Sequence, residues 1–177
     1  MQYLNYGSCF FSKVIIEKVV LNMKVRDFMI TNVISVRPDT TIKAVMETFV
    51  EKKIGGVPIV DANGILSGIV TDGDILRAIK PLDDRIQNYF SYSIFIEGQN
   101  LENRVSEVAS RDIIKIAKTR DIITVKPDDD MGKVVQLLSK HHFKKLPVVN
   151  GVNRVVGVVS RGDVIRNIQS SILKDWK

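Results

Sequence analysis

The feature that most constrains this 177-residue chain is an internal repeat. When the sequence is shifted against itself by 89 residues, positions 32–79 fall on 121–168 without a gap. The two segments share 13 identical residues over 48 positions, whereas average composition implies about three by chance. Duplication of one ancestral unit explains the excess, so we expect two structurally similar halves. The identical positions, numbered in the first copy, are Ile34, Val36, Pro38, Asp39, Val45, Pro58, Val60, Gly68, Val70, Gly73, Asp74, Arg77 and Ile79.

Each copy carries the same order of local patterns. A short β-rich run is followed by a helix with one apolar face, then by two apolar strands joined by a turn, and finally by a second helix. In the first copy, Asn63 and Gly64 occupy the turn, and this pair favours a tight hairpin. The expected elements are 34–36, 42–50, 57–60, 65–70 and 74–79 in the first copy, and 122–125, 131–139, 146–149, 155–159 and 163–172 in the second.

This order predicts a mixed fold of class α/β (α+β), made of two tandem β-α-β-β-α units. One unit is too small to bury its own apolar sheet face. We therefore expect the two units to pack through their sheets with approximate two-fold symmetry, leaving two equivalent clefts between them. The expected division is an N-terminal extension at 1–23, a first domain at 24–80, a connector at 81–103 and a second domain at 104–177.

The copies differ in the stretch before their first strand. In the first copy, 25–29 leads almost directly into Ile34, and its expected counterpart in the second copy is 105–109, at an offset of 80 residues. Compared with the repeat offset of 89, this leaves a nine-residue insertion within 110–120. We expect the insertion to form an additional edge strand, and its sequence indicates no function.

Positive charge is concentrated in the second copy. The net charge of the chain is +6. Residues 23–80 hold 8 Lys/Arg and 7 Asp/Glu, whereas residues 104–177 hold 15 and 8. This imbalance is compatible with a solvated surface, and also with attraction for an anion, either a phosphate group or nucleic acid.

Cysteine content and hydropathy indicate the compartment. The single cysteine, Cys9, rules out an internal disulfide and fits a reducing compartment, so we expect a cytoplasmic protein. No stretch reaches the roughly 18 consecutive apolar residues of a membrane span. The stretch 1–11 lacks the positively charged leading segment of a signal peptide. Residues 1–22 are interpreted as a packing arm, or as the product of a start codon placed too early.

The most informative segment of each copy follows its last strand. The patterns Thr71-x-Gly-Asp74 and Ser160-x-Gly-Asp163 each lie between an apolar strand and an apolar helix. The free N–H groups of a helix start suit phosphate, and a carboxylate can accept two hydrogen bonds from a ribose diol. The same spacing also matches a capping box, with Ser or Thr at the N-cap and an acid three residues later. Capping and ligand binding are both open on this evidence, and they can coexist at one helix start.

The tandem pattern resembles a pair of CBS domains, the family named after cystathionine β-synthase. The resemblance rests on 54–60 with 68–74 in the first copy, on 143–149 with 157–163 in the second, and on the opening segment 25–29. It extends over about 24–80 and 104–170, which is most of the chain.

The resemblance implies a non-catalytic regulatory or energy-sensing module. Its ligand would be an adenosine compound, AMP, ADP, ATP or S-adenosylmethionine, bound in the clefts between the copies. Such chains usually form homodimers, and a partner protein would carry the regulated activity. In this family, Asp74 and Asp163 would bind the ribose, and Thr71 and Ser160 would lie near the phosphates. The base would be bordered by Ser35 and Thr124 and by the segments around the prolines, Gly55, Gly56, Val57, Pro58, Lys144, Lys145, Leu146 and Pro147.

The two candidate sites are chemically unequal. The first copy carries Asp72 inside its motif and two glycines before its proline, whereas the second carries Arg161 and the pair Lys144 and Lys145. A carboxylate beside a polyphosphate is unfavourable, and Lys or Arg is favourable. We therefore expect the second copy to contribute to the site that binds the more highly phosphorylated ligand.

Other functional classes have less support in the sequence. No nucleophile–base set and no Gly-x-x-x-x-Gly-Lys loop is present, so we expect no enzyme, no required cofactor and no metal site. The main alternative is a nucleic-acid-binding protein that uses the basic C-terminal half, although no helix-turn-helix or RNA-binding aromatic motif is recognisable. A structural adaptor with empty clefts is a further alternative.

Overall fold

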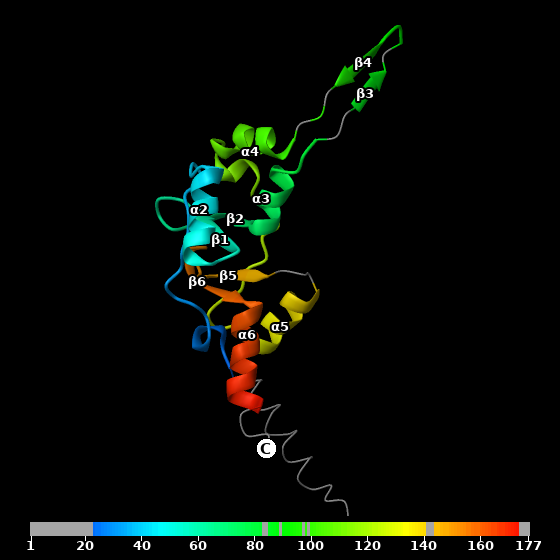
Figure 1. Ribbon diagram of the computed structural model, residues 1–177. Coiled ribbons are helices and arrows are strands. Elements are labelled where there is room, and N and C mark those ends of the chain that lie inside the picture. Colours follow the sequence, from blue (N-terminus) through cyan, green and yellow to red (C-terminus); the bar gives the residue numbers. More distant parts are fainter. Residues whose placement is uncertain are drawn as a thin grey trace, which may run out of the picture. The chain divides into compact units, whose positions relative to one another are not determined.

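A computed structural model describes residues 23–82, 85–88, 90–96, 98, 100–140 and 144–173. The extension 1–22, with Cys9, lies outside these residues. The chain divides into two compact units (Figure 1). Unit 1 combines the residues up to Val33 with those from Ile123 onward, and unit 2 is Ile34–Ile122.

Unit 2 holds the helix–strand–strand–helix order of the first copy. The N-cap of its first helix is Thr41, whose hydroxyl accepts a hydrogen bond from the Ala44 N–H at 3.2 Å. Strands β1 and β2 pair antiparallel, with Val57 opposite Val70. A second antiparallel hairpin and a further helix precede the end of the unit. The elements are α2 (Ile42–Lys52), β1 (Gly56–Val60), β2 (Leu66–Thr71), α3 (Asp72–Ala78), β3 (Arg85–Asn88), β4 (Ser93–Ile96) and α4 (Leu101–Ala109), followed by a 3₁₀ turn at Ile113–Lys115.

Unit 1 repeats this architecture with the second copy. Strands β5 and β6 pair antiparallel, with Leu146 opposite Val159. Helices α5 and α6 contact each other, and the apolar residues that they direct toward the two strands form one core cluster. The elements are a 3₁₀ turn at Val25–Asp27, α5 (Met131–Lys140), β5 (Lys145–Val149), β6 (Val155–Ser160), α6 (Arg161–Ile168) and a π-helical turn at Gln169–Leu173. This mixed composition matches the expected α+β class.

The hairpin turns of the two units use related side-chain chemistry. In unit 2, Oδ1 of Asp61 accepts the N–H groups of Asn63 and Ile65, both at 2.8 Å. Gly64 has a φ of 76°, a conformation that costs glycine little. In unit 1, Asn150 replaces Asp61 and accepts the Arg154 N–H at 3.0 Å. The predicted turn between the two apolar strands is therefore confirmed in the first copy.

The expected first strand of each copy is reduced to a single β-bridge. Val36 pairs in parallel with Ile59, and Val125 pairs in parallel with Val148. The predictions of strands at 34–36 and 122–125 were therefore too long, although both segments do join their sheets. Each run is closed by a proline, which supplies no N–H for a continuing ladder.

The segment before each first strand packs in the unit that contains the other copy. Val25 and Phe28 belong to the core of unit 1, whereas Ile113 belongs to the core of unit 2. Backbone bridges repeat this exchange, because Ile30 pairs with Val158 and Lys118 pairs with Ile69. The boundaries of the compact units therefore differ from the boundaries of the two sequence copies.

These bridges correct the expected counterpart of 25–29. The structural equivalent of 24–30 is 112–118, because Lys24 bridges Asp130 as Asp112 bridges Thr41. Residues 105–109 instead belong to α4, which contacts α2 and has no counterpart among the described residues of unit 1. The expected edge strand within 110–120 is a 3₁₀ turn followed by the single bridge at Lys118. Ile113 is fully buried, with 0% exposure, and this burial identifies 112–118 as the equivalent of 24–30. The local similarity of 105–109 to 25–29 does not identify it.

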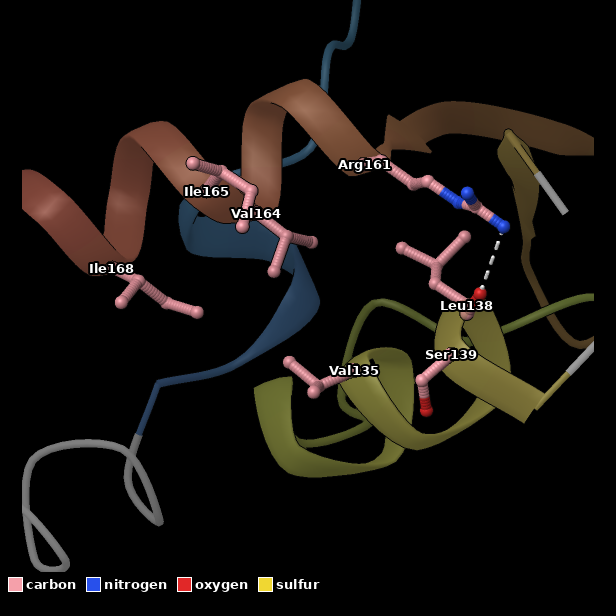
Figure 2. A pocket seen from close by; sticks show the side chains of 7 residues that line it. All are labelled: Val135, Leu138, Ser139, Arg161, Val164, Ile165 and Ile168. Carbon is pink, nitrogen blue, oxygen red and sulfur yellow. Dashed lines mark hydrogen bonds between the residues drawn. The ribbon is translucent and has the colours of Figure 1, made fainter. Parts of the chain in front are cut away.

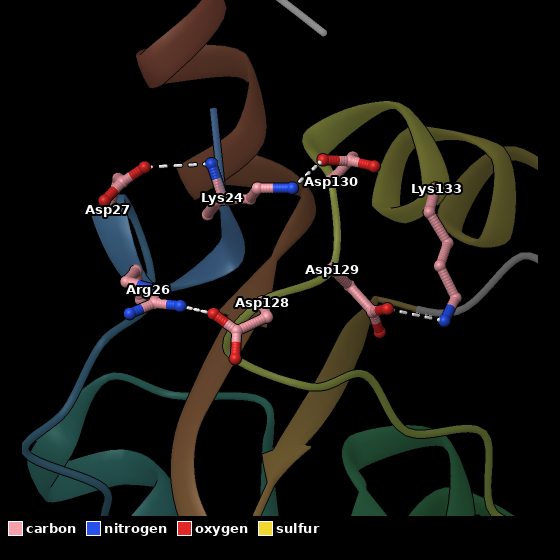
Figure 3. A network of polar contacts seen from close by, with 7 residues as sticks. All are labelled: Lys24, Arg26, Asp27, Asp128, Asp129, Asp130 and Lys133. Carbon is pink, nitrogen blue, oxygen red and sulfur yellow. Dashed lines mark hydrogen bonds and ion pairs between the residues drawn. The ribbon is translucent and has the colours of Figure 1, made fainter. Parts of the chain in front are cut away.

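Charged side chains connect the first turn of unit 1 to the start of α5 (Figure 3). Lys24 Nζ lies 2.6 Å from Oδ1 of Asp130, and Arg26 pairs with Asp128. Asp129 accepts from Lys133 Nζ at 2.8 Å. Each of three successive acids is thus paired with a basic side chain, and none of the described residues forms a group of three or more acidic, His or Cys side chains that could hold a metal ion.

The expected connector, 81–103, contains the β3–β4 hairpin and the first residues of α4 within its described part. In the described ranges, no helix combines the length and the hydropathy that crossing a bilayer requires.

Candidate functional site

In unit 2, the candidate residues meet where β1 begins and β2 ends. Gly56 stands opposite Thr71 in the antiparallel ladder. The backbone N–H of Asp72 donates to the carbonyl oxygen of Gly55 at 3.1 Å. This pairing places the segment before the proline directly beside the Ser/Thr-x-Gly-Asp motif.

Unit 1 reproduces this arrangement with the second copy. Lys145 stands opposite Ser160, and the backbone N–H of Arg161 donates to the carbonyl oxygen of Lys144 at 3.1 Å. The candidate residues therefore form two separate sets, one in each unit, and each set draws on one copy.

The hydroxyl-bearing residues of the first strands join these sets through the backbone. Ser35 precedes Val36, whose N–H donates to the carbonyl oxygen of Pro58 at 3.1 Å. Thr124 precedes Val125, whose N–H donates to Pro147 at the same distance. The backbone of Ser35 and of Thr124 is thus held next to the proline segment of its own unit.

Two of the candidate residues belong to the hydrophobic core clusters, and Gly56, Pro58, Pro147 and Asp163 are buried as well. The side chains of Val57 and Leu146 are each 1% exposed and belong to the core clusters. They can therefore present only backbone atoms to a ligand. Their main role in this structure is to pack the start of β1 and of β5 against the helices.

The two motif carboxylates both form capping boxes. In unit 1, Oδ2 of Asp163 accepts the N–H of Ser160 at 2.9 Å and the Ser160 hydroxyl at 2.6 Å. The Asp163 N–H donates back to Ser160 Oγ at 3.2 Å. In unit 2, Oδ2 of Asp74 accepts the N–H of Thr71 at 2.8 Å and its hydroxyl at 2.6 Å. The capping alternative is therefore confirmed as a structural role of both motifs.

This geometry constrains how either hydroxyl could serve a ligand. A hydroxyl has one proton to donate, and in both motifs that proton points to the aspartate. A phosphate oxygen would have to compete with the aspartate for it. The exposed fraction of the Asp163 side chain is only 7%, against 13% for Asp74, so the carboxylate of unit 1 is the more enclosed.

The residue after the N-cap differs between the two units in charge and in contacts. Asp72 accepts the N–H of Gly73 at 2.7 Å. A Cβ atom on Gly55 would lie 2.9 Å from Oδ2 of Asp72, so a side chain there would force this carboxylate to move. In unit 1, the Arg161 guanidinium instead donates to the carbonyl oxygen of Leu138 at 3.2 Å, near the end of α5 (Figure 2).

A pocket between α5 and α6 lies next to this arginine (Figure 2). Its lining is mostly aliphatic, and neither Ser160 nor Asp163 contributes to it. Of the candidate residues, only Arg161 lines this pocket, so the pocket does not bring the residues of the Ser160 motif together. The lining residues are Val135, Leu138, Ser139, Arg161, Val164, Ile165 and Ile168.

The sequence did not lead us to predict two equivalent ion pairs, one in each unit. Arg77 forms an ion pair with Asp74, and Arg166 forms an ion pair with Asp163. Arg77 and Arg166 are identical between the copies and lie three residues after the aspartates on a helix. Identity at this spacing is the signal that could have revealed both pairs.

Comparisons with known proteins identify what this chain resembles. A family model described as CBS domain matches residues 25–81 and 105–170, which is more than half of the chain. The chloroplastic CBS domain-containing protein CBSX2 of Arabidopsis thaliana is 30% identical over 148 residues, covering 80% of this chain and 62% of that protein. The chain thus spans less than two thirds of the length of this relative.

Solved structures share the fold. The crystal structure of CBSX2 in complex with AMP has a TM-score of 0.65 at 24% identity and covers 84% of this chain and 98% of that chain. The CBS domain pair of protein MJ0100, in complex with 5′-methylthioadenosine and S-adenosyl-L-methionine, has a TM-score of 0.62 at 24% identity. It covers 84% of this chain and 97% of that chain. These likenesses confirm the expected tandem α+β fold.

Proposed function

This chain belongs to the CBS domain family, and on that premise we propose that it is a non-catalytic regulatory module that binds adenosine-containing ligands. AMP, ADP, ATP and S-adenosylmethionine are the proposed ligands. The module would transmit their binding to a partner protein that carries the regulated activity.

The observation that carries the proposal is a carboxylate held in the same way in both units. Asp74 and Asp163 are each fixed by a neighbouring N-cap residue, beside the strand segment that precedes the proline. A fixed carboxylate suits the 2′,3′-diol of a ribose. The ligands in the structures of CBSX2 and MJ0100, AMP, 5′-methylthioadenosine and S-adenosyl-L-methionine, all contain this sugar.

The other candidate residues have proposed roles around the same ligand. Thr71 and Ser160 would lie near the phosphates, and Ser35 and Thr124 would border the base. The backbone of the segments before the two prolines would complete the base site. Clefts between the two copies remain the proposed location of these sites.

Thermal unfolding with AMP, ADP, ATP, S-adenosylmethionine and GMP tests the proposal. A ligand at about 100 times its dissociation constant adds roughly 2.7 kcal/mol of stability. For a chain of this size, that corresponds to a rise in Tm of about 5–10 °C. We expect such a shift with the adenosine compounds and not with GMP. A folded sample that responds to none of them would contradict the proposal.

The difference in charge between the units leads to a preference among phosphorylated ligands. Arg161 and Lys145 of the second copy favour additional phosphate, whereas Asp72 of the first opposes it. Replacing Arg161 and Lys145 with alanine should reduce the affinity for ATP more than the affinity for AMP. Arg154→Ala removes an exposed cation from the hairpin turn of the same unit and should leave the ratio of the two affinities unchanged. An unchanged ratio in the Arg161→Ala and Lys145→Ala variants would contradict the preference.

The alternative function, nucleic-acid binding, rests on the excess of positive charge in 104–177. Binding of that kind weakens steeply as salt concentration rises, whereas recognition of adenosine depends on the base and the ribose. A chain that shifts a labelled DNA or RNA duplex and ignores adenosine ligands would favour this alternative. We further propose a homodimer, testable by light scattering, and a cytoplasmic location, which the single Cys9 motivates.

A further inference from the structure

A glycine, an aspartate and an arginine recur together in the two motifs. Gly162, Asp163 and Arg166 of unit 1 correspond to Gly73, Asp74 and Arg77 of unit 2, with the same identities and the same spacing. The proposed function uses the aspartates and assigns nothing to the arginines.

The acceptor positions of the Asp163 carboxylate are largely taken. Oδ2 accepts both donors of Ser160, at 2.9 and 2.6 Å. Oδ1 accepts a hydrogen bond from the Arg166 guanidinium. Since each carboxylate oxygen offers about two acceptor positions, Oδ2 is saturated and Oδ1 retains one. A ribose diol that donates two hydrogen bonds therefore finds only one position available.

The same occupancy recurs in unit 2. Oδ2 of Asp74 accepts both donors of Thr71, and Arg77 occupies Oδ1. Two units with different neighbouring residues thus place an arginine on the same carboxylate oxygen.

Each glycine lies next to the guanidinium of its arginine. A Cβ atom on Gly162 would lie 3.3 Å from Nη1 of Arg166. On Gly73, it would lie 3.5 Å from Nη1 of Arg77. A side chain would make ordinary contact with the guanidinium at position 73 and a slightly tight contact at position 162, so each guanidinium lies directly over the first turn of its helix.

We propose that Arg166 and Arg77 are internal competitors of the ribose, which must leave Oδ1 before the carboxylate can accept both hydroxyls of the diol. This inference rests on the proposed function. The arginine is the donor that leaves, because its side chain is 73% exposed in both units and an exposed ion pair is weak. The Ser160 donors belong to the cap of α6, and losing them would cost more.

The competition sets the affinity for the ribose and makes it depend on salt. Salt screens an exposed ion pair, so it weakens the hold of the arginine on the carboxylate. An uncharged nucleoside should therefore bind the protein more tightly at high ionic strength. Binding through a phosphate would show the opposite dependence, which is why the test uses adenosine.

The experiment is calorimetric titration of adenosine into the 177-residue chain at 20 mM and at 500 mM NaCl. The screening length is about threefold longer at the lower concentration, and about twofold shorter at the higher one, than in physiological salt. For the wild type, we expect affinity to rise with salt. For Arg166→Gln with Arg77→Gln, we expect adenosine to bind about two- to fivefold tighter than the wild type at low salt. In this variant the affinity should not depend on salt.

Lys133→Gln is the matched control. It removes a cation from unit 1 that pairs with Asp129 and does not touch Asp163. It should leave both the affinity and its salt dependence as in the wild type. Urea unfolding of each variant at the titration temperature verifies that it is folded.

Two results would overturn the inference, and they can be told apart from failure of the proposed function. If the arginine variant binds adenosine as the wild type does, with the same salt dependence, the arginines do not compete. If it binds more weakly, the arginines assist the ligand. If the folded wild type binds neither adenosine nor AMP, the proposed function itself fails.

Discussion

The Arg166 guanidinium donates a hydrogen bond to Oδ1 of Asp163, the carboxylate that also forms the capping box at the start of helix α6. Arg77 and Asp74 form the same pair at the start of α3. One side chain thus stabilises the helix start and offers the acceptor atoms that a ribose would use. In the proposed function, stability and ligand binding are therefore coupled at these two aspartates, and variants of their neighbours can separate the two properties.

The hydroxyl of Ser160 should contribute to stability through the cap of α6. Ser160→Ala removes the hydrogen bond to Asp163 Oδ2 and leaves the Asp163 N–H without its 3.2 Å acceptor. We expect the free energy of unfolding to fall by about 1 kcal/mol, measured by urea denaturation.

Ser139→Ala is the matched control for this cap. Its hydroxyl donates to the carbonyl oxygen of Gln136 at 3.0 Å in an exposed position, so its loss should change stability by less than about 0.5 kcal/mol. Equal effects of the two substitutions would show that the capping box of α6 contributes nothing specific.

The opening segment of the first copy should be sensitive to added volume on β6. A Cβ atom on Gly157 would lie 2.7 Å from Sδ of Met29 and 3.3 Å from the carbonyl oxygen of Ile30. Met29 can adjust, but the backbone of Ile30 is fixed by its bridge to Val158. We expect Gly157→Ala to destabilise the protein by about 1–3 kcal/mol.

Gly132→Ala is the control for the glycine substitution. The residue is in α5, and a Cβ placed there would have no atom within 4 Å other than its chain neighbours and its own helix backbone. Alanine should stabilise this helix by up to about 1 kcal/mol. If Gly157→Ala proved as harmless as Gly132→Ala in urea denaturation, the packing of 24–30 against β6 would be contradicted.

Asp129 should make stability depend on pH. Burial raises the pKa of this carboxyl, but hydrogen bonds from the Lys126 N–H and the Lys133 ammonium, each at 2.8 Å, outweigh burial. The pKa therefore lies below the ordinary value of 3.8. A lowered pKa means that the carboxylate stabilises the fold above the unfolded pKa, and that this contribution is lost as pH falls through the folded pKa.

Comparing the wild type with Asp129→Asn measures this contribution. At pH 6, we expect the variant to be less stable by about 1 kcal/mol. The difference should shrink as pH falls below the ordinary value of 3.8. Asp128→Asn, whose side chain is 71% exposed, should have little effect at either pH. A difference for Asp129→Asn that stays constant with pH would contradict the assignment.

The repeated architecture was predictable because its signals are local. The apolar face of 42–50, the turn at 61–64 and the two apolar strands each follow from residue spacing, and all recur at a constant offset of 89. The capping boxes follow equally from spacing, since Ser160 and Asp163 are three residues apart. Such features depend on neighbours in the sequence, and the chain shows them twice.

The exchange of the opening segments was not predictable, because it depends on contacts distant in sequence. Val25 packs with residues such as Val125 and Met131, about a hundred positions away. The similarity of 105–109 to 25–29 favoured the wrong counterpart. Only burial of Ile113 and the bridge from Lys118 to Ile69 identify the correct one. For the same reason, sequence spacing alone did not determine the length of the first strands.

The most direct test of the central claim is calorimetric titration of AMP into the wild type and into the variant that combines Asp74→Asn with Asp163→Asn. Asn retains an acceptor oxygen for the cap but loses the charge that strengthens hydrogen bonds from a ribose diol. We expect AMP to bind the wild type, and its affinity to fall at least about tenfold in the double variant. Asp129→Asn, with the same change of charge outside both motifs, should bind AMP as the wild type does. Undiminished affinity in the folded double variant would contradict the claim that these two carboxylates bind the ribose.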